Sequence, residues 1–583
     1  MARVRLAIAY AAIAAAALLT QGGAAHATPP PPTPTAGTNV RVTLDNGTST
    51  WKSADQLAGG SYTDAVLARC TTDRRQQNEP TLAIDPRNPD VWAAGSNNYC
   101  TTATVGDAWA GFYRSSNGGG TWTNSLLPGY LGDSSTQGAA SPLSSLVAGG
   151  AIASGDPVMA WDGSGNLFFM GNNFNRGTDN GNSGFTTRDN IGSVWVATYA
   201  PKDPSDNRTD GQKYVRTVVL AQNTFGLGSS NDKTAMAVDP ATGIVYAAWS
   251  DFRGSGGASI MFSRSTDHGA SFSTPVRLSA ATSGNQGPSI AIGAGGQVFV
   301  SWVGSAGGPA MNSVTGAAFV SSADYGKTFT NARIAVPYRA FDSSQFSGNG
   351  ARDCGDGPYA CPTGFTFPRF DLAQPYLAAD TVHGTVVMAF QTALPSGQGQ
   401  IQVATSTDGG SHWSTPTALA PSGTGHQFFP YLVASAGRVS AIWYDSRGDG
   451  DYAATRPPCN SATGATSACL NVRYAASTDG GSTWGTSIRV TSRPFNPNYE
   501  QFGGRRVPFL GDYITVAAQG DRIGAVWADQ RDTVAAADRT GDADGADVAG
   551  DPETGGTCTS LSTTCFDTSG GLDQNVYAAV IRP

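Results

Sequence analysis

A short motif occurs five times along this chain and constrains its fold more than any other feature. It has the form Ser-x-Asp/Asn-x-Gly-x-x-aromatic, and its copies span residues 115–122, 265–272, 322–329, 406–413 and 477–484. An Asp or Asn side chain can cap the backbone amides of its own turn, and glycine supplies the positive φ that a tight hairpin turn needs. The aromatic residue can pack the turn against its sheet. The five copies therefore predict a repeated β-hairpin and an all-β repeat fold.

A second repeat supplies the rest of each unit. It consists of a Pro-x-apolar-Ala-x-Asp segment, a glycine turn and a β-rich strand, and it begins near Pro80, Pro157, Thr234, Pro288, Pro375, Pro430 and Leu510. Continuous apolar strands between turns are typical of buried inner strands. Seven starts favour a single β-propeller of seven four-stranded blades, with six blades as the alternative. Residues 40–44 would close the ring against residues 576–581.

Composition agrees with this fold and excludes some partners. The chain has 74 glycines and only 14% charged residues, a profile typical of turn-rich all-β proteins. Its net charge is -8, without a basic stripe, so we expect no nucleic-acid partner. Its basic residues are mostly isolated arginines, which suit planar anions such as carboxylates.

The N-terminus predicts export. Residues 1–27 read as a signal peptide, with early arginines, an apolar run too short to span a bilayer, and an Ala-His-Ala cleavage pattern. Residues 28–38 are proline-rich and predict a disordered linker, which leaves 39–583 for the propeller. No later apolar run is long enough for a membrane helix. We therefore expect a secreted, extracellular monomer.

Eight cysteines in an exported chain favour disulfides. Proximity in the sequence suggests four pairings, although eight cysteines allow 105. The suggested pairs are Cys70/Cys100, Cys354/Cys361, Cys459/Cys469 and Cys558/Cys565.

A Trp-x-Asp-x-Arg pattern follows the second strand of three predicted blades, ending at Arg253, Arg447 and Arg531. Loops at this position and loops entering the inner strand should open on one face of a propeller, opposite the five hairpin turns. Two interpretations stay open. Each Asp–Arg could be a local ion pair that fixes its loop, or the arginines could converge on a planar anion such as a carboxylate.

The five-copy motif is the Asp-box (BNR repeat), and the chain resembles sialidases and other Asp-box β-propellers. The resemblance implies a tyrosine nucleophile, Tyr513, activated by a glutamate. Only three glutamates exist in the chain, and Glu79 and Glu500 are the candidates. It also implies arginines that hold a sugar carboxylate: Arg253, Arg447, Arg531 and Arg506. The chain departs from the family at the (F/Y)RIP arginine motif, where it reads Asn78-Glu79-Pro80.

Carboxylates give a second chemistry. Asp156 and Asp232 are assigned to the same position, at the entrance of the second and third inner strands, and Asp512 lies before the last one. They could form the acid pair of ordinary glycoside hydrolysis, as in xyloglucanase-like Asp-box enzymes. Further on, Asp542, Asp544 and Asp547 could wrap Ca²⁺, although a solvated insertion is the favoured interpretation, and we expect no other cofactor.

These observations predict a glycan-active protein, with carbohydrate as substrate or ligand. The favoured activity is a sialidase-like exo-glycosidase that hydrolyses terminal sugars, acidic ones included. The alternative is a non-catalytic propeller that binds glycan or protein at the cell surface or in the extracellular matrix. A polysaccharide lyase would need a tyrosine or histidine base, and the chain has only five histidines.

Overall fold

The computed structural model describes residues 33–72, 76–101, 108–174, 192–203, 211–223, 229–253, 257–306, 316–338, 374–454, 458–459, 467–497, 510–532 and 573–583. The chain divides into 1–33 and 34–583, and the second unit carries the fold. The expected signal peptide and the start of the expected linker lie outside the described residues.

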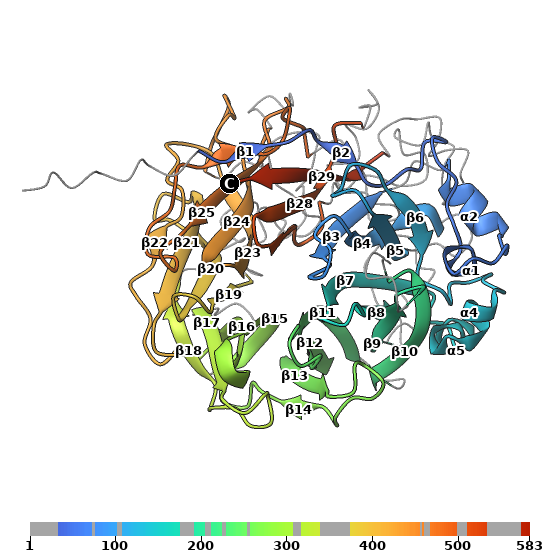
Figure 1. Cartoon of the computed structure of the whole chain (residues 1–583). Coiled ribbons are helices and arrows are strands. Elements are labelled where there is room, and N and C mark those ends of the chain that lie inside the picture. The colour runs from blue at the N-terminus through green and yellow to red at the C-terminus, as the bar shows by residue number, and fades with distance from the viewer. Residues whose placement is uncertain are drawn as a thin grey trace, which may run out of the picture. The chain divides into compact units, whose positions relative to one another are not determined.

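Residues 34–583 form a seven-bladed β-propeller, as the repeats predict, and Figure 1 shows the blades around a common centre. In the first six blades four antiparallel strands follow one another from the centre outwards. Blade one consists of β3 (Gln77–Ile84), β4 (Trp92–Asn98), β5 (Trp109–Ser115) and β6 (Thr123–Leu126), and blade two of β7 (Ala153–Trp161), β8 (Leu167–Phe174), β9 (Ser193–Ala200) and β10 (Lys213–Gln222). Blade three consists of β11 (Ser229–Val238), β12 (Val245–Arg253), β13 (Ala258–Ser265) and β14 (Val276–Arg277), and blade four of β15 (Ser283–Ile292), β16 (Val298–Ser305), β17 (Gly316–Ser322) and β18 (Arg333–Pro337). Blade five consists of β19 (Tyr376–Asp380), β20 (Thr385–Ala393), β21 (Gly399–Ser406) and β22 (Thr417–Ala418), and blade six of β23 (Gln427–Ser435), β24 (Arg438–Asp445), β25 (Asn471–Ser477) and β26 (Ile488–Arg489).

The seventh blade joins the two ends of the unit. Its strands β27 (Thr515–Gln519), β28 (Arg522–Asp529) and β29 (Asn575–Arg582) are completed by β1 (Thr35–Ala36) and β2 (Val40–Arg41), which both pair with β29. Val40 lies opposite Ala578, so the predicted closure is confirmed, although the pairing strand is shorter than 40–44. Each inner strand contacts the next around the ring, and β27 contacts β3. The inner strands therefore form a closed circle.

The five repeated motifs form turns between the third and fourth strands of their blades. In the turn at 322–329, the Ser322 hydroxyl donates to Asp324 at 2.8 Å and accepts from the Gly326 amide at 2.9 Å. The Asp324 carboxylate accepts from the Thr328 amide at 2.9 Å. The same bonds recur in the other four copies. Side chain and backbone thus cap each other in every turn.

Apolar side chains are buried between neighbouring blades. Phe262 and Ile260 of β13 pack with Val298, Val300 and other residues of the fourth blade in one cluster, and similar clusters join the other blades. The second strands of five blades each carry a fully buried tryptophan: Trp92, Trp249, Trp302, Trp443 and Trp527. The rigid inter-blade cores hold the inner strands in place around the axis.

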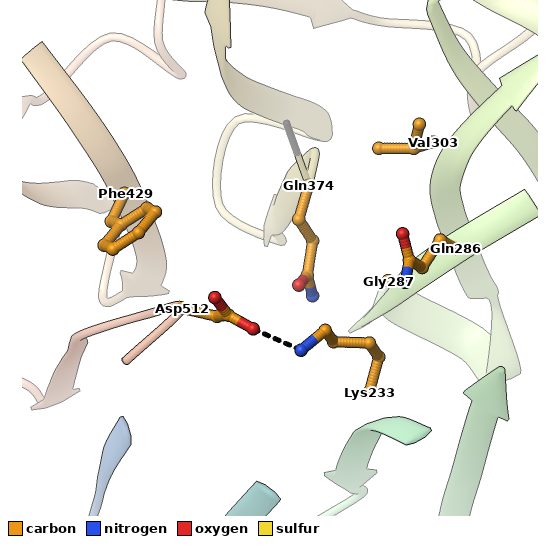
Figure 2. A pocket seen from close by; sticks show the side chains of 7 residues that line it. All are labelled: Lys233, Gln286, Gly287, Val303, Gln374, Phe429 and Asp512. Carbon is orange, nitrogen blue, oxygen red and sulfur yellow. Dashed lines mark hydrogen bonds and ion pairs between the residues drawn. The ribbon is translucent and has the colours of Figure 1, made fainter. Parts of the chain in front are cut away.

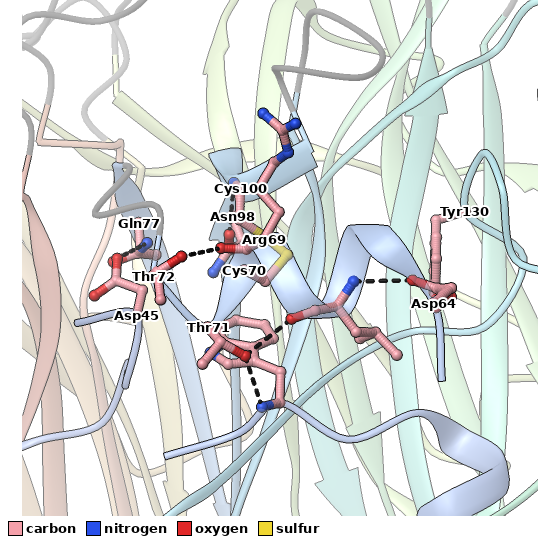
Figure 3. Close-up of a disulfide and its surroundings, with 12 residues drawn as sticks. Asp45, Asp64, Arg69, Cys70, Thr71, Thr72, Gln77, Asn98, Cys100 and Tyr130 are labelled. Carbon is pink, nitrogen blue, oxygen red and sulfur yellow. Dashed lines mark hydrogen bonds between the residues drawn. A yellow bond between two sulfur atoms is a disulfide. The ribbon is translucent and has the colours of Figure 1, made fainter. Parts of the chain in front are cut away.

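Short helices lie in the connections: α1 (Ala54–Leu57), α2 (Ala65–Cys70), α4 (Thr136–Ala140), α5 (Pro142–Ala148), and the 3₁₀ turns η1 (Tyr99–Thr101) and η3 (Ala294–Gly296). The Cys70–Cys100 disulfide ties the end of α2 to η1, next to the start of β3 and the end of β4 (Figure 3). Cys459–Cys469 lies in the connection from β24 to β25. Both predicted pairings are confirmed; Cys354/Cys361 and Cys558/Cys565 lie outside the described residues.

Both disulfides lie at the end of the blades where the chain enters the inner strands, which we call the entrance face. The register fixes this geometry, because Gln77 at the start of β3 is opposite Asn98 at the end of β4. The hairpin turns lie at the other end of the blades, as expected, since Ser115 is opposite Trp92 at the start of β4. Among the described helices, none is long and apolar enough to cross a bilayer.

Candidate functional site at the propeller axis

One backbone irregularity repeats at the entrance of five inner strands. The register of inner strand and second strand shifts there by a β-bulge in blades one, two, three, four and six. In each bulge one residue has a positive φ: Glu79 (54°), Asp156 (52°), Lys233 (54°), Gly287 (63°) and Phe429 (50°). A non-glycine residue in this region is strained, and strained residues cluster at functional sites. The bulge re-aims these side chains relative to the strand.

Side chains of the preceding blade hold the strained residues in place. The amide of Asp156 donates to Asn97 of β4 at 3.1 Å, and the amide of Phe429 donates to Gln391 of β20 at 2.8 Å. The amide of Gly287 donates to Ser250 of β12 at 3.1 Å. Each donor and acceptor is buried, so these bonds contribute more than exposed ones would. The second strand of one blade therefore fixes the entrance of the next.

This geometry corrects one sequence assignment. Asp156 and Asp232 were expected at equivalent positions, but the positive-φ residue of the third bulge is Lys233. Asp232 lies one residue earlier, in register with Ser250, as Gly155 is with Asn172. The repeat contains Thr234 where five of the other six entrances have proline, and this obscured the alignment. A cation therefore occupies the position at which a carboxylate was expected.

Lys233 joins carboxyl groups from three blades. Its ammonium group forms an ion pair with Asp512 and lies 4.0 Å from Asp232. Its backbone amide donates to the Asp156 carboxyl at 2.7 Å. The side chains of Lys233 and Asp512 are only 10% and 9% exposed, so this pair is shielded from water. One residue thus fixes an ionised carboxylate at its ammonium group and a second carboxyl at its amide.

Glu79 and Asp156 complete the cluster beside Lys233. Asn97 donates to Glu79 at 2.8 Å, and Asn172 donates to Asp156 at 3.2 Å. Burial raises the pKa of Glu79, and the negative charge of Asp512 raises it further, against the opposing effect of Lys233. Burial also raises the pKa of Asp156 well above that of an exposed aspartate, helped by the charge of Asp232. These carboxyl groups can hold a proton at a pH where exposed ones have lost it.

The ammonium group of Lys233 has a raised pKa and stays protonated. Burial alone would lower the pKa of its ammonium group, but the surrounding carboxylates, Asp232 and Asp512 first, raise it. The cluster therefore combines a fixed positive charge with carboxyl groups of raised pKa. Environments that shift the pKa values of neighbouring titratable groups in this way are typical of catalytic sites.

A pocket opens beside this cluster on the propeller axis (Figure 2). Its empty space of about 300 Å³ includes open solvent, and the part that a water-sized sphere can occupy has room for about one water molecule. Lys233 and Asp512 point into one side of it, and Phe429, Gln374 and Gln286 border the other. The complete lining is Lys233, Gln286, Gly287, Val303, Gln374, Phe429 and Asp512.

Tyr513 lies next to the cluster but does not bond to a carboxylate among the described contacts. Its hydroxyl donates to the Pro157 carbonyl at 3.3 Å, and its side chain is buried. Burial raises the pKa of this phenol well above its usual value, and the charges of Glu79 and Asp156 raise it further. This environment opposes formation of a phenolate.

The three predicted arginines each pair with the aspartate two residues before them. Arg447 and Arg531 meet their partners at 2.7 Å, and Arg253 meets its partner at 2.8 Å. Their exposure differs: the side chain of Arg253 is 73% exposed, that of Arg447 30% and that of Arg531 5%. Arg531 also lies over the ring of Tyr577, 4.3 Å from its centre. In all three, a local carboxylate already neutralises the guanidinium group.

Some predicted residues lie outside the described part of the chain: Glu500, Arg506, Asp542, Asp544 and Asp547. The axial cluster brings together Glu79, Asp156, Asp232, Asp512 and Tyr513. Within the described ranges, no group of three or more His, Cys, Asp or Glu side chains is arranged to hold a metal.

Sequence reasoning missed Lys233, the two asparagines and the neutral pocket residues. A signal for several of them was present, because the residue before the repeated proline is the bulge residue in four blades. Reading that column around the ring gives Glu79, Asp156, Lys233, Gly287, Gln374, Phe429 and Asp512. It contains acids and a lysine on one half of the ring and neutral residues on the other.

Comparison with known proteins identifies no family for this chain. No family model and no curated protein matches the chain. Among solved structures, a sialidase from Trypanosoma rangeli in complex with the inhibitor DANA is 12% identical, with a TM-score of 0.39 over 71% of this chain and 58% of its own. A lectin from Burkholderia pseudomallei is 10% identical, with a TM-score of 0.41 over 79% and 94% of the two chains.

An α-L-arabinanase from Penicillium chrysogenum, complexed with arabinobiose, is 13% identical, with a TM-score of 0.37 over 71% of this chain and 94% of its own. Likenesses this distant carry no argument about activity. The propeller assignment rests on the strand pairing, and the function has to be argued from the axial site.

Proposed function

We propose that the protein is an exported glycoside hydrolase that cleaves terminal sugars at the axial carboxyl cluster. The observation that carries the proposal is the position of Lys233, which holds Asp512 at its ammonium group and Asp156 at its amide. Lys233 thereby links Asp512, which lines the pocket, to Asp156, a carboxyl group of raised pKa. Glycoside hydrolysis needs such a pair.

The roles follow from the surroundings of each group. The Asp156 carboxyl, with Glu79 beside it, supplies the proton that the glycosidic oxygen receives as its bond to the anomeric carbon breaks. Asp512 lines the pocket and accepts a proton from the water that attacks that carbon. Lys233 supplies the counter-charge of Asp512. Tyr513, which bonds to the Pro157 carbonyl, positions the second inner strand instead of attacking the sugar.

The disulfides support the view that the protein acts outside the cytoplasm. The two described disulfides suit an oxidising compartment, and each pins a loop on the entrance face. The neutralised arginines Arg253, Arg447 and Arg531 give less support to a carboxylate-bearing sugar than the sequence resemblance does.

A panel of fluorogenic glycosides, the sialoside included, tests the proposal on protein that starts at Thr28. We expect Asp512→Asn and Asp156→Asn each to lower kcat by about 10²–10⁴-fold. Tyr513→Phe should retain activity within a few-fold. The control is Asp521→Asn, whose carboxylate is 85% exposed and belongs to no cluster.

The pH profile adds a second readout. Activity should fall as pH rises through the raised pKa of the proton donor, because the donor then loses the proton it must supply. That alkaline limb should lie well above pH 4, the range of an exposed carboxyl. Release that vanishes only in Tyr513→Phe would contradict the carboxyl mechanism and favour the tyrosine nucleophile.

A non-catalytic binding propeller is the second candidate. It is favoured by the hydrogen bonds that Asn97 donates to Glu79 and Asn172 donates to Asp156, because these bonds give both carboxyl groups a structural role. In that case Lys233 and the carboxyl groups would stabilise the ring entrance, and the pocket would bind a glycan without cleaving it. Binding without turnover on any glycoside of the panel would favour this function.

A further inference from the structure

Two arginines lie opposite each other on the outer part of blade six. Arg473 of β25 is the cross-strand partner of Arg489 of β26, so the two side chains lie on the same face of the sheet. Like charges directly opposite each other destabilise a sheet. The strands β23 and β24 lie between this pair and the propeller axis (Figure 1). The pair is therefore separate from the axial cluster, and the proposed hydrolysis gives it no role.

The fold does not require two arginines at this position. The equivalent residue of the third strand lies four positions before the serine of the turn motif, and its cross-strand partner lies in the fourth strand. The equivalent pairs are Met261 and Arg277 in blade three, Ala318 and Ile334 in blade four, and Gln402 and Ala418 in blade five. The same strands are thus built in these blades with one charge or with none.

A neighbouring carboxylate does not neutralise the pair. Burial lowers the pKa of the Arg473 guanidinium group, and the charges of Arg447 and Arg489 lower it further, against the opposing effect of Asp445. The oxygens of Asp445 are already occupied, because they accept from Arg447 at 2.8 and 2.7 Å and from Trp443 at 3.1 Å. The two arginines therefore concentrate positive charge at one place in a chain whose net charge is -8.

The described partners of Arg473 and Arg489 are serine oxygens. Arg473 donates to the Ser487 hydroxyl at 3.1 Å and to the Ser487 carbonyl at 2.7 Å. Arg489 donates to the Ser492 carbonyl at 3.4 Å, and its side chain is exposed. A guanidinium group has about five N–H donors. Most donors of the pair are therefore not used by the described bonds and can reach a ligand.

The pair suits a carboxylate. A guanidinium group is a planar fork that donates two parallel hydrogen bonds to the two oxygens of a carboxylate. Cross-strand partners have Cβ atoms about 5 Å apart, so two forks can meet at one anion. A bound anion would also remove the repulsion between the arginines. The negative net charge opposes a dense polyanion such as nucleic acid and favours a ligand with few, separated charges, as on an acidic glycan.

We propose that Arg473 and Arg489, the rim site, bind the carboxylate of an acidic sugar unit. This assignment goes beyond the proposed function, because the rim site contributes binding and not bond cleavage. It rests on the proposed function only for the view that the carboxylate belongs to a carbohydrate. An acidic sugar would then be recognised at the rim of blade six, and not by the paired arginines Arg253, Arg447 and Arg531.

The test is isothermal titration of the chain from Thr28 with three probes. They are a galacturonate tetrasaccharide, its methyl ester and inorganic sulfate. We expect the tetrasaccharide to bind and the methyl ester, which lacks the charge, to bind about 10-fold more weakly. Arg489→Met should lower the affinity for the tetrasaccharide by about 10-fold for the same reason. The affinity of the unchanged protein should fall as NaCl is raised from about 50 to 300 mM.

The matched control is Arg277→Met. Arg277 occupies the equivalent position in blade three, opposite Met261 instead of an arginine. The variant removes the same charge from the protein and should bind the tetrasaccharide as the unchanged protein does. Arg473→Gln combined with Arg489→Ala reproduces the pair of blade five and covers the case in which Arg489→Met does not fold. This double variant should keep its thermal midpoint, lose the binding, and cleave small fluorogenic glycosides unchanged.

The outcomes separate the rim site from the proposed function. Loss of tetrasaccharide binding in Arg489→Met, with no hydrolysis by the unchanged protein, would support the rim site and remove the enzyme. Hydrolysis that depends on Asp156, with equal tetrasaccharide binding by Arg489→Met, would overturn the rim site and keep the enzyme. Binding of sulfate alone would show a site for small ions and overturn the assignment to a sugar. Equal binding of the methyl ester, or no binding of the tetrasaccharide, would overturn it as well.

Discussion

The two ends of the blades follow opposite rules. At the turn end, five hairpins repeat both backbone and side chains, and the Ser–Asp–Gly hydrogen bonds recur in each copy. At the entrance end, five bulges repeat the backbone but carry Glu79, Asp156, Lys233, Gly287 and Phe429. A position that keeps its shape and changes its side chain around a ring is suited to building an asymmetric site on a symmetric scaffold.

This contrast separates stability from chemistry. The Ser and Asp or Asn side chains of the turns form the same hydrogen bonds within each of the five hairpins. The entrance residues bond across blades that are far apart in sequence, as Lys233 and Asp512 do over 279 positions. A buried cluster of this kind is a poor way to stabilise a fold, because desolvation of the charges offsets their attraction. Substitutions at the entrance end should therefore cause stability losses of very different size, whereas equivalent substitutions at the turn end should cause similar losses.

Removing the cation at the entrance should have the largest effect on stability. Lys233→Met leaves Asp512 and its neighbours buried without a counter-charge, and we expect a loss of about 3–5 kcal/mol at pH 7. Without Lys233 the pKa values of these carboxyl groups rise further in the folded state. The loss should then be complete above the raised values and shrink as pH falls towards about 4, the value in the unfolded chain.

Thermal unfolding at pH 5 and pH 7, at one scan rate, measures this effect. Lys327→Met is the control, because Lys327 is an exposed residue of a repeated turn. A loss for Lys233→Met that is the same at both pH values would show that the residue acts through packing. It would contradict the charge-based account of the cluster.

The scaffold could be predicted from the sequence because each of its signals is local. The turn motif contains its own capping groups, and seven repeated strand starts give the blade number. Even the closing strand at Val40 could be found from its alternation and position. The propeller therefore follows from short-range patterns that one sequence displays.

The site could be predicted only in part, because its contacts cross the ring axis. Glu79, Asp156 and Asp512 were candidates through residue type and position, but their meeting point depends on Lys233. A lysine is usually solvated, and Lys233 is followed by Thr234 instead of the proline that marks most of the other entrances. Contacts across the axis, such as that of Lys233 with Asp512, are properties of the folded ring and have no sequence signature of their own.

The three Trp-x-Asp-x-Arg loops provide a graded test on the entrance face. We expect Arg531→Met to cost about 2–3 kcal/mol, because its partner Asp529 would remain fully buried. Arg253→Met should cost less than about 0.5 kcal/mol, since an exposed pair contributes little. Arg447→Met should lie between them. Thermal midpoints of the three variants give the order, and equal losses would contradict the role of burial.

The turn end should give the smallest and most uniform effects. Ser322→Ala removes a hydroxyl that donates to Asp324 and accepts from the Gly326 amide, and we expect a loss of about 1 kcal/mol. The same substitution at Ser115, Ser265, Ser406 and Ser477 removes the same two bonds, so the five thermal midpoints should agree closely. None of the five should change binding or hydrolysis at the axis, because the turns lie at the opposite end of the blades. A turn variant that altered the axial chemistry would break the division of labour between the two ends, and it would mean that a hairpin at one end of a blade controls the bulge at the other.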